Sequence, residues 1–203
     1  MTVSLLMLIV LSACLHVYWN VLVKKTEDRL CFLWWMYVIS FPLVPVVVAF
    51  IESDNISTVT WLVICLSGFV HALYTIALSY AYDNGDLSLV YPLARSAPVF
   101  VTVGAIVLLG EMPSIAGFAG IILIVAGSYI VGLESLTISQ IVMPMRMLKD
   151  RAYQLALLSA AITGIYSVVD RIGVYSANPF KFIVLLLCVE AVFYTPFVLW
   201  KRN

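Results

Sequence analysis

Two charged residues stand apart because each lies inside a long apolar run. Arg95 lies between Pro92 and Pro98, and Glu190 lies in the last apolar run of the chain. A charge at the centre of a bilayer costs roughly 2.5–3.5 kcal/mol on insertion scales, so such charges tend to mark substrate or proton pathways. An arginine there can hold an anionic group such as a carboxylate. A glutamate there can take up and release a proton.

Both charges also have purely structural interpretations. Arg95 can reach toward the membrane surface or pair with a neighbouring helix, and Glu190 can pair with Arg95 itself. Pro92 and Pro98 are predicted to break the helix around Arg95, which is tolerated where the freed backbone lines a cavity. The sequence therefore predicts a broken helix with a cation at its middle.

Further polar and aromatic residues are candidates for the same pathway. His16 and Asn20 are four positions apart and share a helix face, with Trp19 on the adjoining stripe. His71 and Tyr74 fall near one face of another apolar run. Each of these residues alone is also typical of an interfacial anchor or a core side chain. The full set of pathway candidates is Arg95, Glu190, His16, Trp19, Asn20, His71, Tyr74, Tyr91 and Tyr166.

Membrane-spanning helices must position these residues. The chain is 64% hydrophobic and 11% charged, against roughly 25% charged in soluble domains. A bilayer core needs roughly 20 apolar residues of helix. Such runs occur at about 2–23, 31–51, 58–82, 87–109, 113–133, 152–169 and 182–200. The sequence predicts an all-α, polytopic transmembrane bundle of about seven helices.

Several function classes are disfavoured. The formal net charge is +0, which gives no basic footprint for nucleic acid. The four cysteines fit no metal-binding spacing. We find no phosphate-binding P-loop and no hydrolase motif. We therefore expect no enzyme, no cofactor and no metal, and expect the lipid bilayer and a small molecule as partners.

An internal repeat relates the two ends of the chain. Residues 11–20 resemble residues 158–167, and Lys24 then falls opposite Arg171. A repeat unit of five helices is odd, so its second copy must enter the membrane from the opposite side. Inverted repeats of this kind recur in secondary transporters, which hold substrate near the midplane between the copies.

The order of several motifs resembles a known family. The elements that carry the likeness are the stretch 72–78, Ser88-Leu89-Val90-Tyr91-Pro92-Leu93, Leu109-Gly110-Glu111 and the glycine-rich stretch 117–127. Together they resemble the EamA domain of the drug/metabolite transporter superfamily. The resemblance implies a five-helix domain at 1–133, an interfacial linker at 134–151, and the first two helices of a second domain at 152–203.

Two structural roles are expected in the stretch that resembles EamA. Glu111 is expected to cap the following helix at its positively polarised N-terminus. Gly117, Gly120 and Gly127 are expected to permit close helix packing.

The orientation has two conflicting indications. The positive-inside rule places the loop after the first helix in the cytoplasm, whereas the resemblance implies a cytoplasmic N-terminus.

The leading functional hypothesis is a transporter in the plasma or inner membrane that exports or takes up a small metabolite by alternating access. The first alternative is a truncated or partner-dependent fragment, which itself or another chain would complete. A second is a seven-helix receptor. A retinal protein is disfavoured because Lys181 and Lys201 lie only at the ends of the last helix.

Overall fold

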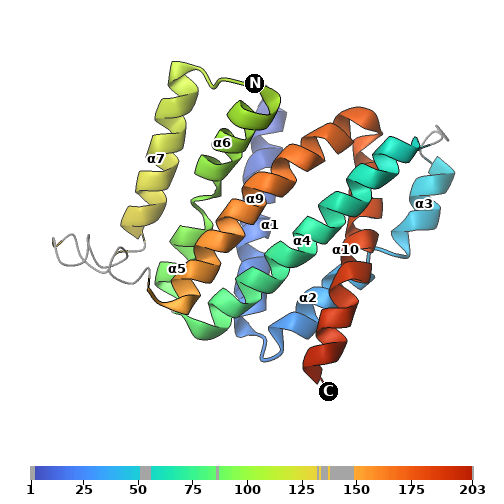
Figure 1. Ribbon diagram of the computed structural model, residues 1–203, viewed down its shortest axis with the longest axis horizontal. Helices are drawn as coiled ribbons and strands as arrows, with labels where there is room; N and C mark the ends of the chain where they lie inside the picture. The colour runs from blue at the N-terminus through green and yellow to red at the C-terminus, as the bar shows by residue number, and fades with distance from the viewer. Residues whose placement is uncertain are drawn as a thin grey trace.

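The computed structural model describes residues 3–50, 56–85, 87–131, 133, 137 and 149–202, and most of the expected interfacial linker lies outside these ranges. The described chain is a bundle of helices (Figure 1). The helices are α1 (Val3–Lys25), α2 (Arg29–Val38), α3 (Leu43–Phe50), α4 (Thr58–Asn84), α5 (Leu87–Ala94), α6 (Ala97–Leu109), α7 (Ile115–Val131), α9 (Arg151–Ser176) and α10 (Pro179–Arg202).

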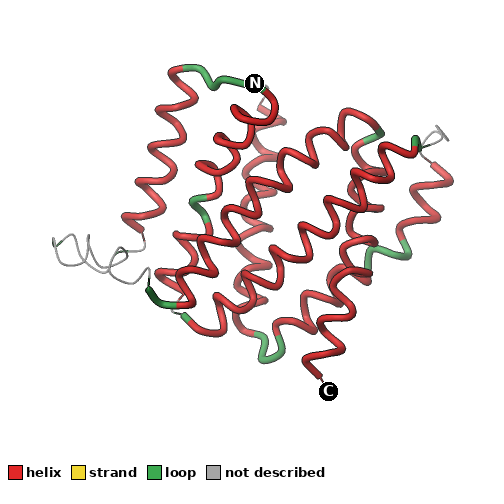
Figure 2. The backbone as a smooth tube through the Cα atoms, viewed as in Figure 1, coloured by secondary structure: helices red, strands yellow, loops and turns green. Residues whose placement is uncertain are grey.

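The helices confirm the predicted membrane architecture. Within the described residues, six helical stretches are long and apolar enough to cross a bilayer, and Ile115–Ile130 is a shorter apolar helix. Two of the six are composite, because α2 and α3 form one stretch and α5 and α6 form another. Figure 2 shows the short non-helical pieces that divide both pairs.

The division between α2 and α3 corrects the expectation of one uninterrupted helix over 31–51. Residues 39–42 form turns instead. Pro42 has no backbone N–H to continue the helix. The Ser40 hydroxyl donates to the Tyr37 carbonyl at 2.6 Å and so satisfies a carbonyl near the end of α2.

Helix α9 is longer than the predicted run of 152–169. It begins after Asp150, whose side chain accepts from the Ala152 amide at 3.0 Å, and it continues to Ser176. The expected end at 169 was wrong because the two charges that follow find partners within the bundle: Asp170 contacts His71 of α4, and Arg171 pairs with Glu111 in the loop between α6 and α7. Both residues therefore belong to the bundle.

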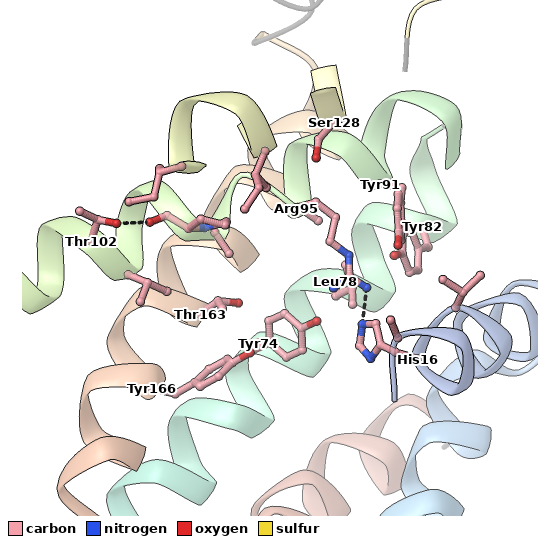
Figure 3. Close-up of a pocket in the computed structure, with 18 residues that line it drawn as sticks. His16, Tyr74, Leu78, Tyr82, Tyr91, Arg95, Thr102, Ser128, Thr163 and Tyr166 are labelled. Carbon is pink, nitrogen blue, oxygen red and sulfur yellow. Dashed lines mark hydrogen bonds between the residues drawn. The ribbon is translucent and has the colours of Figure 1, made fainter. Parts of the chain in front are cut away.

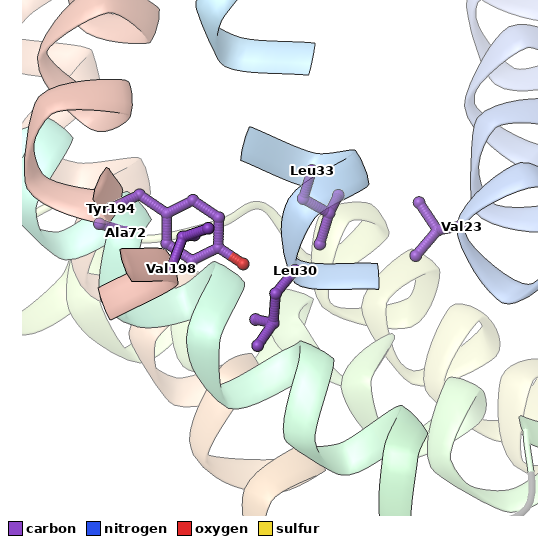
Figure 4. Packing of buried hydrophobic residues seen from close by; sticks show 6 residues of the cluster. All are labelled: Val23, Leu30, Leu33, Ala72, Tyr194 and Val198. Atoms are coloured by element: carbon purple, nitrogen blue, oxygen red, sulfur yellow. The ribbon is translucent and has the colours of Figure 1, made fainter. Parts of the chain in front are cut away.

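Helices α4 and α9 form the centre of the bundle. They run side by side through the middle of Figure 1, and α4 also packs on α10 while α9 also packs on α6 and α5. A neighbouring hydrophobic cluster joins α1, α2, α4 and α10 (Figure 4). Its buried members are Val23, Leu30, Leu33, Ala72, Tyr194 and Val198. These contacts fix α4, which carries much of the polar chemistry described below.

A close helix crossing lies at a glycine that the sequence did not single out. A Cβ added at Gly164 of α9 would lie 2.8 Å from the backbone carbon of Phe100 in α6. The expectation for helix α7 was wrong, because a Cβ at Gly120 or Gly127 meets nothing within 4 Å and one at Gly117 meets only the start of its own helix. The reason is that α7 lies at the edge of the bundle (Figure 1).

Candidate functional site

A cavity of about 780 Å³ opens between α1, α4, α5, α6, α7 and α9. Ligand sites in proteins typically measure about 300–1,000 Å³ and combine apolar walls with a few polar groups. Figure 3 shows the polar side chains that point into this cavity. They are His16, Tyr74, Tyr82, Tyr91, Arg95, Thr102, Ser128, Thr163 and Tyr166.

Arg95 occupies the break between two half-helices. Helix α5 ends at Ala94 and α6 begins at Ala97, with a proline in its first turn. The guanidinium carbon lies 4.8 Å from the centre of the Tyr91 ring, within cation–π range. Its Nη2 donates to Nε2 of His16 at 2.5 Å. Within the described part of the chain, no carboxylate lies within ion-pair distance of Arg95.

His16 has two donors for one acceptor position. Arg95 donates to its Nε2, and Nε1 of Trp19 lies 2.9 Å from its Nδ1. A neutral imidazole accepts on one nitrogen and donates from the other. The two donors therefore compete, and a bond from Arg95 to His16 leaves Trp19 without its acceptor.

The remaining polar wall is aromatic. Tyr74 and Tyr166 meet edge to face, with ring centres 5.6 Å apart, and Tyr82 and Tyr91 lie near Arg95. Aromatic edges and hydroxyls offer apolar surface and hydrogen bonds together. The cavity can thus enclose a mostly apolar body and bind one anionic group at Arg95.

The structure brings five of the nine pathway candidates together. Arg95, His16, Tyr74, Tyr91 and Tyr166 line the cavity. Trp19 contacts His16 and packs on the cluster around Val23, and Asn20 donates to the His16 carbonyl at 2.6 Å. Asn20 also borders a smaller adjoining cavity of about 280 Å³.

The last two candidates, His71 and Glu190, lie in a second polar cluster. Thr75 donates to Oε1 of Glu190 at 3.0 Å, and Nδ1 of His71 lies 3.8 Å from its Oε2. The alternative pairing of Glu190 with Arg95 is therefore wrong. Glu190 sits instead between α4 and α10, with only 2% of its surface exposed.

Sequence reasoning missed Asp170. Its Oδ2 lies 2.9 Å from Nε2 of His71, and its Oδ1 accepts from the hydroxyl of Ser67. The overlooked signal is the helical spacing of Ile165, Val168, Val169 and Ile172, which continues past the acid and indicates that the helix does not end there.

The expected role of Glu111 as a helix cap is also corrected. Its carboxylate forms an ion pair with Arg171 of α9. The expected cap of α7 comes from Ser114, whose Oγ accepts from the Gly117 amide at 3.1 Å. The preceding Gly110 ends α6 with φ of 67°, a left-handed conformation that favours glycine.

Comparison with known families identifies the kind of protein to which this cavity belongs. The sequence profile of the EamA-like transporter family matches residues 3–133. The chain belongs to the EamA-like transporter family. It is a multi-pass membrane transporter of the drug/metabolite type, which places it apart from seven-helix receptors. No curated protein and no solved structure matches the chain.

Family membership gives the cavity a functional context. The match spans α1 to α7, and α9 adds Thr163 and Tyr166 to the cavity wall from outside the matched range. An EamA-like transporter moves small molecules, and the family is not one of enzymes. The partial second repeat at 152–203 stays a prediction.

Proposed function

We propose that this EamA-like transporter carries a small organic anion by alternating access, with the anion bound at Arg95. The observation that carries the proposal is the position of Arg95 at a helix break in the cavity wall. Its hydrogen-bond partner there is the imidazole of His16, which can be displaced without stranding a negative charge. A carboxylate would accept from the guanidinium in a charge-assisted bond, which is roughly twice as strong as a neutral one.

The lining also supports a substrate with an apolar or aromatic body. Around Arg95 the wall consists mainly of alkyl side chains and tyrosine rings. A volume of about 780 Å³ accommodates a ring and a short chain. The substrate class that fits is therefore a monocarboxylate with an apolar body.

Two features support alternating access between inverted copies. Helix α1 runs from the N-terminal end at the top of Figure 1 to the bottom, and α9 runs the other way. Positions 16 and 163, which correspond in the internal repeat, both line the cavity. Substrate held between two such copies is the arrangement expected for a secondary transporter.

Ion pairs close the packing at both ends of the bundle. Arg171 near the end of α9 pairs with Glu111 in the loop after α6, and Arg29 at the start of α2 pairs with Asp83 near the end of α4. Exposed ion pairs contribute little stability, typically about 0–1 kcal/mol. They can therefore break and re-form as the cavity opens alternately to each side. We place this cycle in the plasma or inner membrane of the cell.

The test is flux into vesicles reconstituted with the purified chain. A panel of radiolabelled aromatic and aliphatic monocarboxylates is compared with the matching carboxamides, and protein-free vesicles measure passive permeation. We expect uptake of some carboxylates but not of their amides. Arg95→Ala should lower the apparent affinity about 10- to 100-fold, because a hydrogen bond to a charged group contributes about 1.5–3 kcal/mol.

Two controls make the result specific. Arg95→Lys keeps the charge and should recover part of the affinity, whereas Arg151→Ala removes an exposed cation at the start of α9 and should leave flux unchanged. Equal flux of acids and amides, or full flux in Arg95→Ala, would contradict the proposal. Flux that appears only when a second chain is added would favour the partner-dependent alternative.

A further inference from the structure

The second polar cluster forms a row of neighbouring polar groups through the bundle. It begins at Ser67 and Asp170, passes through the His71 ring to Glu190, and ends at Thr75 and Tyr37. The joining distances are 2.9 Å from His71 Nε2 to Asp170 Oδ2, 3.8 Å from His71 Nδ1 to Glu190 Oε2, 3.0 Å from Thr75 to Glu190, and 2.9 Å between the Thr75 and Tyr37 oxygens. One imidazole thus bridges two carboxyl groups.

The charges of this cluster do not balance without a proton. Asp170 and Glu190 supply two acids, and His71 is the basic group within ion-pair distance of either in the part of the chain described. The remaining titratable groups that face the cluster are tyrosines, namely Tyr37 from α2, Tyr74 from α4, Tyr166 from α9 and Tyr194 from α10. Arg171, beside Asp170 in the sequence, pairs with Glu111. An uncompensated charge in an apolar interior is costly. The cluster is therefore expected to hold a bound proton and to release it only when another proton takes its place.

Access differs between the two acids. The side chain of Asp170 is 24% exposed, whereas that of Glu190 is 2% exposed. Asp170 also lies in the last two turns of α9, whereas Glu190 lies at the middle of α10. A proton from the membrane surface therefore meets Asp170 first and reaches Glu190 through His71. A proton would therefore move from the accessible Asp170 to the buried Glu190.

We propose that Asp170, His71 and Glu190 form a proton relay that couples transport to a proton gradient. In the forward step a proton leaves the Asp170 carboxyl for Nε2 of His71, while the proton on Nδ1 passes to Oε2 of Glu190. One O–H bond and one N–H bond break, and one N–H bond and one O–H bond form. The imidazole stays neutral and exchanges its tautomer, which a second transfer or a ring turn restores.

The relay is open at one joint. The 3.8 Å between His71 and Glu190 exceeds hydrogen-bond distance, so the second transfer requires the ring or α10 to move. The His71 ring lies against Tyr166, which lines the Arg95 cavity. Substrate in that cavity therefore controls the ring that completes the relay. This coupling rests on the proposed transport of an anion.

The first experiment needs no substrate. Infrared difference spectra of the purified chain are recorded across a pH titration, and the C=O stretch of a protonated carboxyl group is followed. We expect a band that disappears in Glu190→Gln and shifts in His71→Gln. Glu27→Gln, which changes an exposed acid, should leave the band unchanged. A band that is the same in the parent chain and Glu190→Gln would overturn the relay.

The second experiment measures coupling directly. The probe is the carboxylate with the largest Arg95-dependent flux. Two rates are measured in vesicles: accumulation driven by a pH gradient, and exchange with equal concentration and equal pH on both sides. The ratio of accumulation to exchange reports the coupling. We expect this ratio to fall in Glu190→Gln and Asp170→Asn to that of vesicles without a pH gradient. An unchanged ratio in both variants would overturn the relay. Absence of exchange in the parent chain would instead contradict the proposed transport, and the infrared result would still test the proton site.

Discussion

The imidazole of His71 lies against the phenol ring of Tyr166, with ring centres 3.8 Å apart and 30° between the ring planes. Tyr166 belongs to the cavity wall, and His71 belongs to the buried acid cluster. This pair is a direct contact between the proposed anion site and the proposed proton relay. A change in either ring is felt by the other through packing rather than through a distant conformational change.

The contact predicts different effects for two substitutions of Tyr166. Tyr166→Phe keeps the ring and should keep pH-driven accumulation, whereas Tyr166→Leu removes the surface that positions His71 and should lower it relative to exchange. The measurement is the accumulation-to-exchange ratio in vesicles. Tyr175→Leu, on the same helix but 82% exposed, is the matched control. Equal ratios in Tyr166→Leu and the parent chain would show that the stacking does not couple the sites.

Competition for His16 predicts an optical signal. When an anion draws Arg95 away, Nδ1 of His16 becomes free to accept from Trp19, so the environment of that indole changes. The measurement is tryptophan fluorescence during titration with a transported carboxylate. We expect a change that is lost in Trp19→Phe and in Arg95→Ala. It should persist in Trp61→Phe, since Trp61 is exposed on α4; a change lost there as well would refute the competition.

The crossing of α6 and α9 predicts a strong effect of a single methyl group. Gly164→Ala would place a Cβ 2.8 Å from backbone atoms of Phe100, so the helices must separate. Overpacking of this kind typically costs about 1–3 kcal/mol. Thermal unfolding in detergent should therefore show a lower midpoint. Gly120→Ala, which meets open space, should be neutral or slightly stabilising because alanine favours helix; similar losses in both variants would contradict the assigned crossing.

The ion pairs of Asp83 predict a small, salt-dependent effect on thermal stability when this residue is replaced. Asp83 pairs with Arg29, and its other oxygen lies 3.6 Å from Nζ of Lys201. Because these side chains are partly exposed, Asp83→Asn should cost less than about 1 kcal/mol. The melting-point difference from the parent chain should shrink as salt is raised, since salt screens exposed charges. Glu27→Gln serves as the control, and a large loss that salt does not alter would indicate a packing defect instead.

Much of the architecture follows from local sequence patterns. Bilayer thickness and apolar run length suffice to place the spanning helices, and two prolines around Arg95 suffice to predict the break there. Arg95 was recognisable because a charge in an apolar run has few harmless explanations. These features depend on neighbours in the chain.

The features that could not be predicted depend on contacts between distant helices. The spacing around Asp170 indicates a continuing helix, but its partner His71, about a hundred positions away, cannot be identified from the sequence. The local sequence does not distinguish the packing of Gly164 from that of Gly120. Only the path of α9 across α6 shows that Gly164 lies at a close contact. The turn at residues 39–42 had a local signal in Pro42, which the run length of 31–51 outweighed because the surrounding residues are as apolar as those of a continuous span.

The central position of α9 also constrains how the protein is made. Helix α4 packs chiefly on α9 and α10, which the ribosome completes after all the helices of the family domain. Since chains are synthesised from the N-terminus, the polar face of α4 with Ser67, His71 and Thr75 enters the bilayer before Asp170 and Glu190 exist. Ser67 and His71 must therefore enter without their partner Asp170, whereas Thr75 can already bond to Tyr37 of α2. The packing of α4 is thus completed only after α9 and α10 have inserted.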